Sequence, residues 1–94
     1  MFIDKEKFTA TMYQVSSGNL SKIGYQYNPV EKCGVVQVEF HNGGVYQYWP
    51  ISKIVYQEIF TAESKGKYFT AKIKQAPGVR YKNMAETGYQ ERLL

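Results

Sequence analysis

The four residues Ser64-Lys65-Gly66-Lys67 could together bind an anion. Serine favours the N-cap position at which a helix begins, and the first turn of a helix presents unpaired N–H groups and a partial positive charge. The two lysines add full charges, and glycine lets a ligand come close to the backbone. Such a helix start can hold a phosphate. It lacks the spacing of a Walker loop, and the alternative is a capped helix whose lysines are only solvated.

Positive charge gathers around this run. Residues 1–63 carry a net charge of −1 and residues 64–94 one of +5, which gives the +4 of the whole chain. Six basic residues and no acidic residue lie between Ser64 and Ala85, interleaved with Tyr68, Phe69 and Tyr81. Basic side chains that contact phosphates and aromatic rings that stack on bases are what single-stranded nucleic acid requires of a protein. The competing interpretation is a charged face that only meets solvent.

The charge pattern therefore favours a non-catalytic binding module for a phosphate-bearing ligand, either RNA or a nucleotide. Phe69 is assigned to the core, and Trp49 is added because it is expected to point away from it. The candidate ligand-binding residues are Ser64, Lys65, Gly66, Lys67, Tyr68, Lys72, Arg80, Tyr81, Lys82 and Trp49.

Catalytic and metal chemistry find little support in the residue types. His41 and Cys33 are the only histidine and the only cysteine, and neither lies in a recognisable nucleophile motif. One histidine and one cysteine cannot complete a structural zinc site. The carboxylates are scattered and form no evident acid–base pair. We expect a protein that is not an enzyme and has no metal or cofactor.

Length and composition predict one small domain over residues 1–94. The chain is 44% hydrophobic and 21% charged, which is ordinary for a globular protein. No apolar run approaches the ~20 residues that span a bilayer, so we expect no membrane association. The N-terminal residues do not resemble a secretory signal, and a single cysteine suits a reducing compartment. The expected location is the cytoplasm.

Alternating side chains predict three antiparallel strands at residues 22–27, 35–40 and 45–49. Whether the loop of the second hairpin has an odd or an even number of residues decides which side chains share a face. A three-residue loop Asn42-Gly43-Gly44, with Gly44 in the left-handed conformation, pairs Phe40 with Tyr46. One face then carries Val36, Val38, Phe40, Tyr46 and Tyr48. Trp49 faces the other way.

Two helices are expected to cover that face. An apolar stripe from Ile51 to Ala62 predicts the first, with Ser52 as N-cap, and a second, shorter helix begins at Ser64. Residues 79–82 could add a C-terminal edge strand. The predicted fold is α+β, a three-stranded antiparallel meander with one main helix and one short helix on one face. Its predicted core consists of Val36, Val38, Phe40, Tyr46, Tyr48, Val55, Ile59 and Phe69.

Four stretches of the sequence resemble the KTSC domain family. They are "VSSGNLSKIGYQY", "VVQVEFHNGGVYQYWPI", "VYQEIFTAESKGKYF" and "KIK". Tyr46-Gln47-Tyr48 matches the Tyr-x-Tyr motif of the family, and residues 64–69 match its Ser-Lys-Gly signature. The resemblance covers residues 15–74 and leaves extensions at 1–14 and 75–94. The family is named for the C-terminus of some lysyl-tRNA synthetases and also occurs alone in small bacterial and phage proteins.

The resemblance implies RNA binding, and it also leaves a second class of function open. A small phage-type accessory protein could inhibit a host factor by protein contact, for which an apolar patch around Trp49 would be the sign. It could instead sequester a nucleotide immune signal, which would need an aromatic pocket, formed for example between the copies of a homo-oligomer. The partners to be weighed are thus RNA or a nucleotide, and a host protein.

Overall fold

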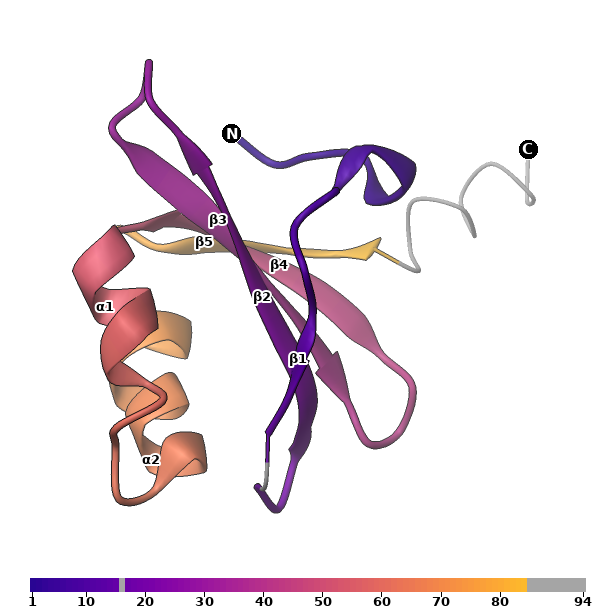
Figure 1. Cartoon of the computed structure of the whole chain (residues 1–94), viewed down its shortest axis with the longest axis vertical. Coiled ribbons are helices and arrows are strands. Elements are labelled where there is room, and N and C mark those ends of the chain that lie inside the picture. The colour runs from indigo at the N-terminus through magenta and orange to yellow at the C-terminus, as the bar shows by residue number, and fades with distance from the viewer. Residues whose placement is uncertain (16, 85–94) are drawn as a thin grey trace.

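The computed structural model describes residues 1–15 and 17–84, which form a sheet between two covering layers (Figure 1). The helices of residues 53–74 lie on one side of the sheet, and the N-terminal segment lies on the other. The strands are β1 (Tyr13–Gln14), β2 (Leu20–Asn28), β3 (Cys33–Phe40), β4 (Val45–Ile51) and β5 (Arg80–Asn83), all antiparallel and in chain order. The helices are η1 (Lys5–Lys7), α1 (Lys53–Glu58), α2 (Lys65–Phe69) and its continuation η2 (Thr70–Lys74). No helix among the described residues is long and apolar enough to cross a membrane.

The sheet has five strands rather than three. The predicted meander is present as β2, β3 and β4, and the predicted C-terminal edge strand is β5, which pairs with β4. Strand β1 was not predicted, because two residues are too few to show an alternating pattern. The first helix is shorter than predicted. Ile51 belongs to β4, where it pairs with Gly34 and its carbonyl accepts a hydrogen bond from the Tyr25 hydroxyl at 2.8 Å.

The hairpin between β3 and β4 has the predicted faces but a different register. Phe40 pairs with Gly44 through an N–H···O bond of 2.9 Å, and Val38 lies opposite Tyr46. The three-residue loop is therefore His41-Asn42-Gly43, and Gly43, with φ of 91°, is the left-handed residue. The predicted loop at residues 42–44 was wrong by one position at each end. Moving both ends together shifts the pairing by two residues, so each side chain keeps its face.

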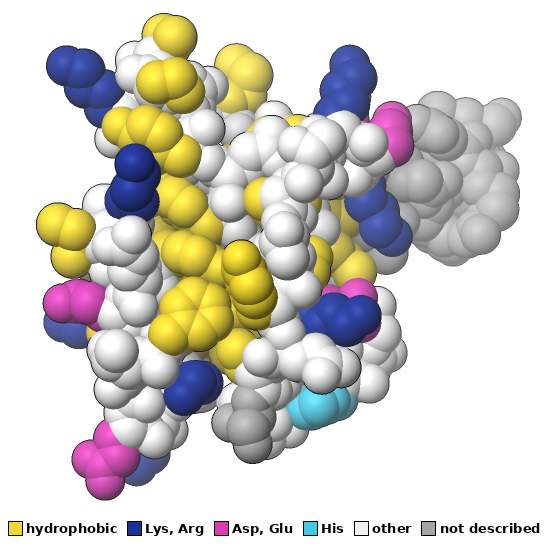
Figure 2. All heavy atoms as spheres, in the orientation of Figure 1, with side chains coloured by type: hydrophobic (Ala, Val, Ile, Leu, Met, Phe, Trp, Pro, Cys, Tyr) yellow, Lys and Arg dark blue, Asp and Glu magenta, His cyan; other side chains and the backbone are white. Residues whose placement is uncertain are grey.

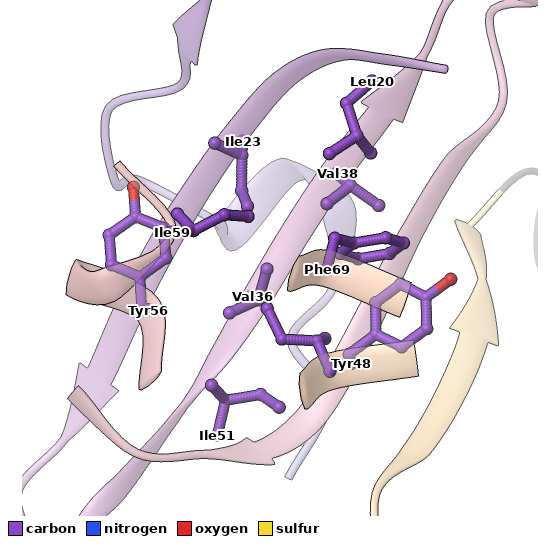
Figure 3. Packing of buried hydrophobic residues seen from close by; sticks show 10 residues of the cluster. Leu20, Ile23, Val36, Val38, Tyr48, Ile51, Tyr56, Ile59 and Phe69 are labelled. Carbon is purple, nitrogen blue, oxygen red and sulfur yellow. The ribbon is translucent and has the colours of Figure 1, made fainter. Parts of the chain in front are cut away.

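The core lies between the helices and one face of the sheet (Figure 3). Of the predicted core residues, five are buried: Val36, Val38, Tyr48, Ile59 and Phe69. Phe40, Tyr46 and Val55 are partly buried and pack against them. Both predicted N-caps are confirmed, since Ser52 Oγ accepts from the N–H of Val55 at 3.2 Å and Ser64 Oγ from that of Lys67 at 3.4 Å. The caps and the apolar stripes together place the helices over the aromatic face.

The opposite face of the sheet is covered by residues that precede β1. Gln47 is fully buried there, and its side chain bonds to both backbone groups of Ile3, with N···O distances of 2.9 and 2.8 Å. Close to Gly24 the cover is so tight that an added Cβ would lie 2.6 Å from Met12 Sδ. The N-terminal extension thus forms the second layer of the domain.

Buried tyrosines should make the free energy of unfolding fall as the pH rises above 10. Burial raises the pKa of Tyr25, Tyr48 and Tyr56 from 10.0 to about 12. Between pH 10 and 12 the unfolded chain therefore loses phenolic protons that the folded chain keeps. The contribution of these groups to the free energy of unfolding is complete below pH 10 and declines as the pH rises towards 12.

Tyr56→Phe should make this decline shallower. The Tyr56 hydroxyl is buried and has no hydrogen-bond partner in residues 1–15 and 17–84, so its removal should cost little at pH 7. Tyr25→Phe removes the same kind of group but also the bond to the Ile51 carbonyl; it should cost about 1 kcal/mol at pH 7. Urea unfolding at pH 7 and at several values between 10 and 12 measures both effects. An unchanged pH dependence in Tyr56→Phe would contradict the explanation.

Candidate functional site

The start of α2 faces the turn between β1 and β2 across an open groove. Residues 17–19 line one wall and residues 63–67 the other, with Thr70, Ala71 and Gln75 along the helical stretch that follows. The groove has a volume of about 660 Å³. We call it the α2 groove. Four of the predicted ligand-binding residues, Ser64, Lys65, Gly66 and Lys67, line it.

Hydrogen bonds hold both walls of the α2 groove in place. His41 braces the turn, because its Nε2 lies 3.0 Å from the carbonyl oxygen of Ser17 and its backbone N–H donates to Asn19 at 3.0 Å. On the other wall, Thr70 Oγ1 donates to the Gly66 carbonyl at 3.0 Å. A Cβ added at Gly66 would lie 3.1 Å from Ser17 Oγ. Glycine therefore permits the close approach of the two walls.

Donors predominate in the α2 groove. Among the described residues, neither Lys65 nor Lys67 forms an ion pair, and the N–H groups of Lys65 and Gly66 have no acceptor. Ser64 and Thr70 contribute hydroxyl groups. The carboxylate of Glu63 also lines the groove and opposes an anion there. The balance of these groups is positive.

A second concave surface lies beside the groove, and we call it the tyrosine hollow. It has a volume of about 490 Å³ and is lined by Phe40, Asn42, Tyr46, Tyr48, Lys74, Gln75 and Tyr81. Gln75 lines both the groove and the hollow. A smaller depression of about 290 Å³ also links them, since it shares Gly18 and Asn19 with the groove and Phe40 and Asn42 with the hollow.

The sequence model of the KTSC domain matches residues 16–76, about two thirds of the chain. The chain belongs to the KTSC domain family. The matched residues include all those that line the α2 groove. Two of the stretches that carry the resemblance, around residues 17–19 and 64–67, meet there although more than 40 residues separate them.

The fold is also similar to a solved member of the KTSC family. The crystal structure of a KTSC domain protein from Yersinia pestis superposes with a TM-score of 0.62 at 24% sequence identity, covering 80% of this chain and 97% of that one. A comparison with curated proteins gave no match. These similarities establish the family and the fold of this KTSC domain.

Several predicted ligand-binding residues lie away from the groove. Arg80 and Lys82 pair with Trp49 and Gln47, which places their side chains on the opposite face of the sheet. Trp49 is partly buried there, and its Nε1 is buried without a partner among the described residues. The basic segment is therefore divided between two faces, because side chains alternate along β5. Lys72 is exposed on η2 and does not line the groove.

Tyr68 joins the two helices. Its hydroxyl lies 3.1 Å from the Val55 carbonyl and 3.0 Å from Glu58 Oε1 on α1, and its ring packs against the core. Burial, with a smaller contribution from Glu58, raises the pKa of this hydroxyl. The Tyr68 ring therefore packs against the core and is not available to stack on a ligand. Tyr81, in contrast, is exposed at the edge of the tyrosine hollow.

Sequence reasoning missed the wall of the groove formed by residues 17–19, as well as Thr70, Ala71 and Gln75. The polar turn Ser17-Gly18-Asn19 was a signal only in combination with the later motif. Cys33 and His41 lie at opposite ends of β3, roughly 25 Å apart along an extended strand, so they do not form a catalytic pair. In residues 1–15 and 17–84 no cluster of three His, Cys, Asp or Glu side chains could hold a metal ion.

Proposed function

We propose that this KTSC domain is a non-catalytic binding module for a phosphate-bearing ligand, RNA or a nucleotide, and that a phosphate lies in the α2 groove. The observation that carries the proposal is the placement of Lys65 and Lys67, free of ion pairs among the described residues, beside unpaired backbone N–H groups at the start of α2. Ammonium groups and backbone N–H groups are the donors that proteins use for phosphate oxygens.

The chain belongs to the KTSC domain family, and the RNA-binding role that the sequence resemblance implies agrees with this proposal. The residues that line the groove all lie within the family match. A module that binds through the lysines of an open groove should show affinity that falls with salt, since binding releases the counterions of the phosphates.

Lys65→Ala combined with Lys67→Ala should weaken binding by about tenfold or more. The slope of log affinity against log salt should also become shallower by about one to two units. Fluorescence anisotropy with short single-stranded RNAs, and thermal shift with a panel of nucleotides and cyclic dinucleotides, measure these effects at low and at physiological salt.

The matched control is Lys5→Ala with Lys7→Ala, which removes the same charge from η1, outside the groove. It should retain most of the affinity. Glu63→Gln removes the opposing carboxylate and should strengthen binding. If neither RNA nor any nucleotide binds at low salt, or if the two double variants lose affinity equally, the groove is not a phosphate site.

A contact with a host protein is the second candidate, and exposed aromatic side chains favour it. The rings of Tyr13 on β1 and Phe60 after α1 are exposed and meet edge to face at 6.0 Å. Figure 2 shows hydrophobic side chains gathered between the helices and β1. This hydrophobic surface lies on the helical side of the sheet, whereas Trp49, around which a patch was expected, is partly buried on the opposite face. A single partner retained after nuclease treatment would favour this function over RNA binding.

A further inference from the structure

In the tyrosine hollow, two aromatic rings of β4 pack beside the ring of an exposed tyrosine. Tyr48 is buried, and its ring lies 6.3 Å from that of Tyr81; Tyr46 lies 6.2 Å from the same ring. Tyr81 is 68% exposed. Asn83 Nδ2 donates to the Tyr46 hydroxyl at 3.1 Å and so orients the ring. The Tyr-x-Tyr motif therefore supports one free aromatic face.

Groups that suit a nucleobase surround this face. Asn42 and Gln75 place amides at the hollow, and amides can bond to the edges of bases. Lys74 adds positive charge for a phosphate. A hollow that combines an exposed ring, amides and a lysine has the chemistry of a base-stacking site rather than that of an apolar peptide groove.

The hollow and the α2 groove are parts of one surface. They share Gln75, and the depression at residues 18–19, 40 and 42 connects them a second time. From Lys65 to Gln75 the helical stretch covers roughly 15 Å at about 1.5 Å per residue. About four nucleotides of stacked strand span this length at roughly 3.4 Å each. A ligand that contacts both ends is therefore an extended chain.

We infer that the tyrosine hollow is a base-stacking subsite, and that the ligand is single-stranded RNA whose phosphates follow the α2 groove while a base stacks on Tyr81. The inference rests on the proposed function and names its ligand class. It gives a defined role to Tyr81, which lies outside the family match, and it makes Tyr46 and Tyr48, which were assigned only to the core, the support of that ring.

Tyr81→Ala should weaken the binding of a six-nucleotide RNA by about tenfold, as expected for the loss of one stacked base. Tyr81→Phe keeps the ring and should bind within about threefold of the wild type. Lys82→Ala changes the neighbouring residue on the opposite face of β5 and should have a small effect. Because Tyr81 is mostly exposed, the variants should fold, which circular dichroism and thermal unfolding verify.

Two further probes separate stacking from other effects. A six-unit abasic strand keeps the phosphates and lacks the bases, so Tyr81→Ala should leave its affinity unchanged. A mononucleotide should bind more weakly than the RNA. Equal losses with RNA and abasic strand, or no loss with either, would overturn the stacking subsite. A mononucleotide bound as tightly as the RNA would overturn the extended strand, while salt-sensitive loss in the Lys65/Lys67 variant would still support the phosphate groove.

Discussion

Phe69→Ala should lower the free energy of unfolding by about 3–5 kcal/mol, the cost of removing a buried phenyl ring from a core. Phe69 is 3% exposed and lies edge to face against Tyr48 at 5.2 Å and Phe40 at 6.0 Å. It is the residue through which α2 packs against the aromatic face of the sheet. A domain of this size is expected to have roughly 5–14 kcal/mol of total stability, so the change would leave a substantial unfolded fraction in moderate denaturant.

Urea or guanidinium unfolding followed by circular dichroism measures this effect. Ile54→Ala is the matched control, since it also shortens an apolar side chain on a helix but one that is 66% exposed. The control should change the free energy by no more than about 0.5 kcal/mol. A Phe69→Ala protein with nearly wild-type stability would show that α2 is not anchored by this ring. The position of the α2 groove would then need another explanation.

Gln47→Leu should release the N-terminal layer and lower the free energy of unfolding by about 2–3 kcal/mol. The Gln47 side chain is 0% exposed; it bonds to the N–H and the carbonyl of Ile3 and donates to Gln37 Oε1 at 2.8 Å. Leucine is similar in size but can make none of these bonds. The buried partner groups would lose their hydrogen bonds, and water can satisfy those of Ile3 only if the segment moves away.

Hydrogen exchange provides the specific measurement for this variant. The amide of Ile3 should lose its protection in Gln47→Leu, whereas amides in β2 and β3 should keep most of theirs. Gln57→Leu makes the same change at an exposed position on α1 and should affect neither stability nor exchange. Retained protection of Ile3 would show that other contacts of the N-terminal segment are sufficient to hold it.

The predictions from sequence were most accurate where the physics is local. Alternation along β3 and β4 assigned the core face correctly, and Ser52 and Ser64 were identified as N-caps by their position before an apolar stripe. The predicted hairpin register was wrong for a physical reason. Gly43 and Gly44 both tolerate a left-handed conformation, and parity distinguishes faces but not registers that differ by two residues.

Burial of Gln47 shows where local patterns fail. On alternation alone it is an outward-facing polar residue of a strand, yet the structure buries it completely beneath the N-terminal segment. That segment has no clear period, so nothing in it predicted a layer. The strand β1 and the covered second face both follow from contacts that join residues far apart in the chain.

Some features of the candidate site were likewise predictable from neighbouring residues, and others were not. A capped helix start with lysines at residues 65 and 67 is predictable from the amino-acid order, because capping and charge depend on neighbouring residues. Three features follow from the folded chain instead: residues 17–19 form the facing wall, Arg80 and Lys82 lie on the opposite face, and Tyr81 lies beside the Tyr-x-Tyr motif. Those outcomes depend on which strands pair and in which register, and strand pairing is set by the packing of the whole domain.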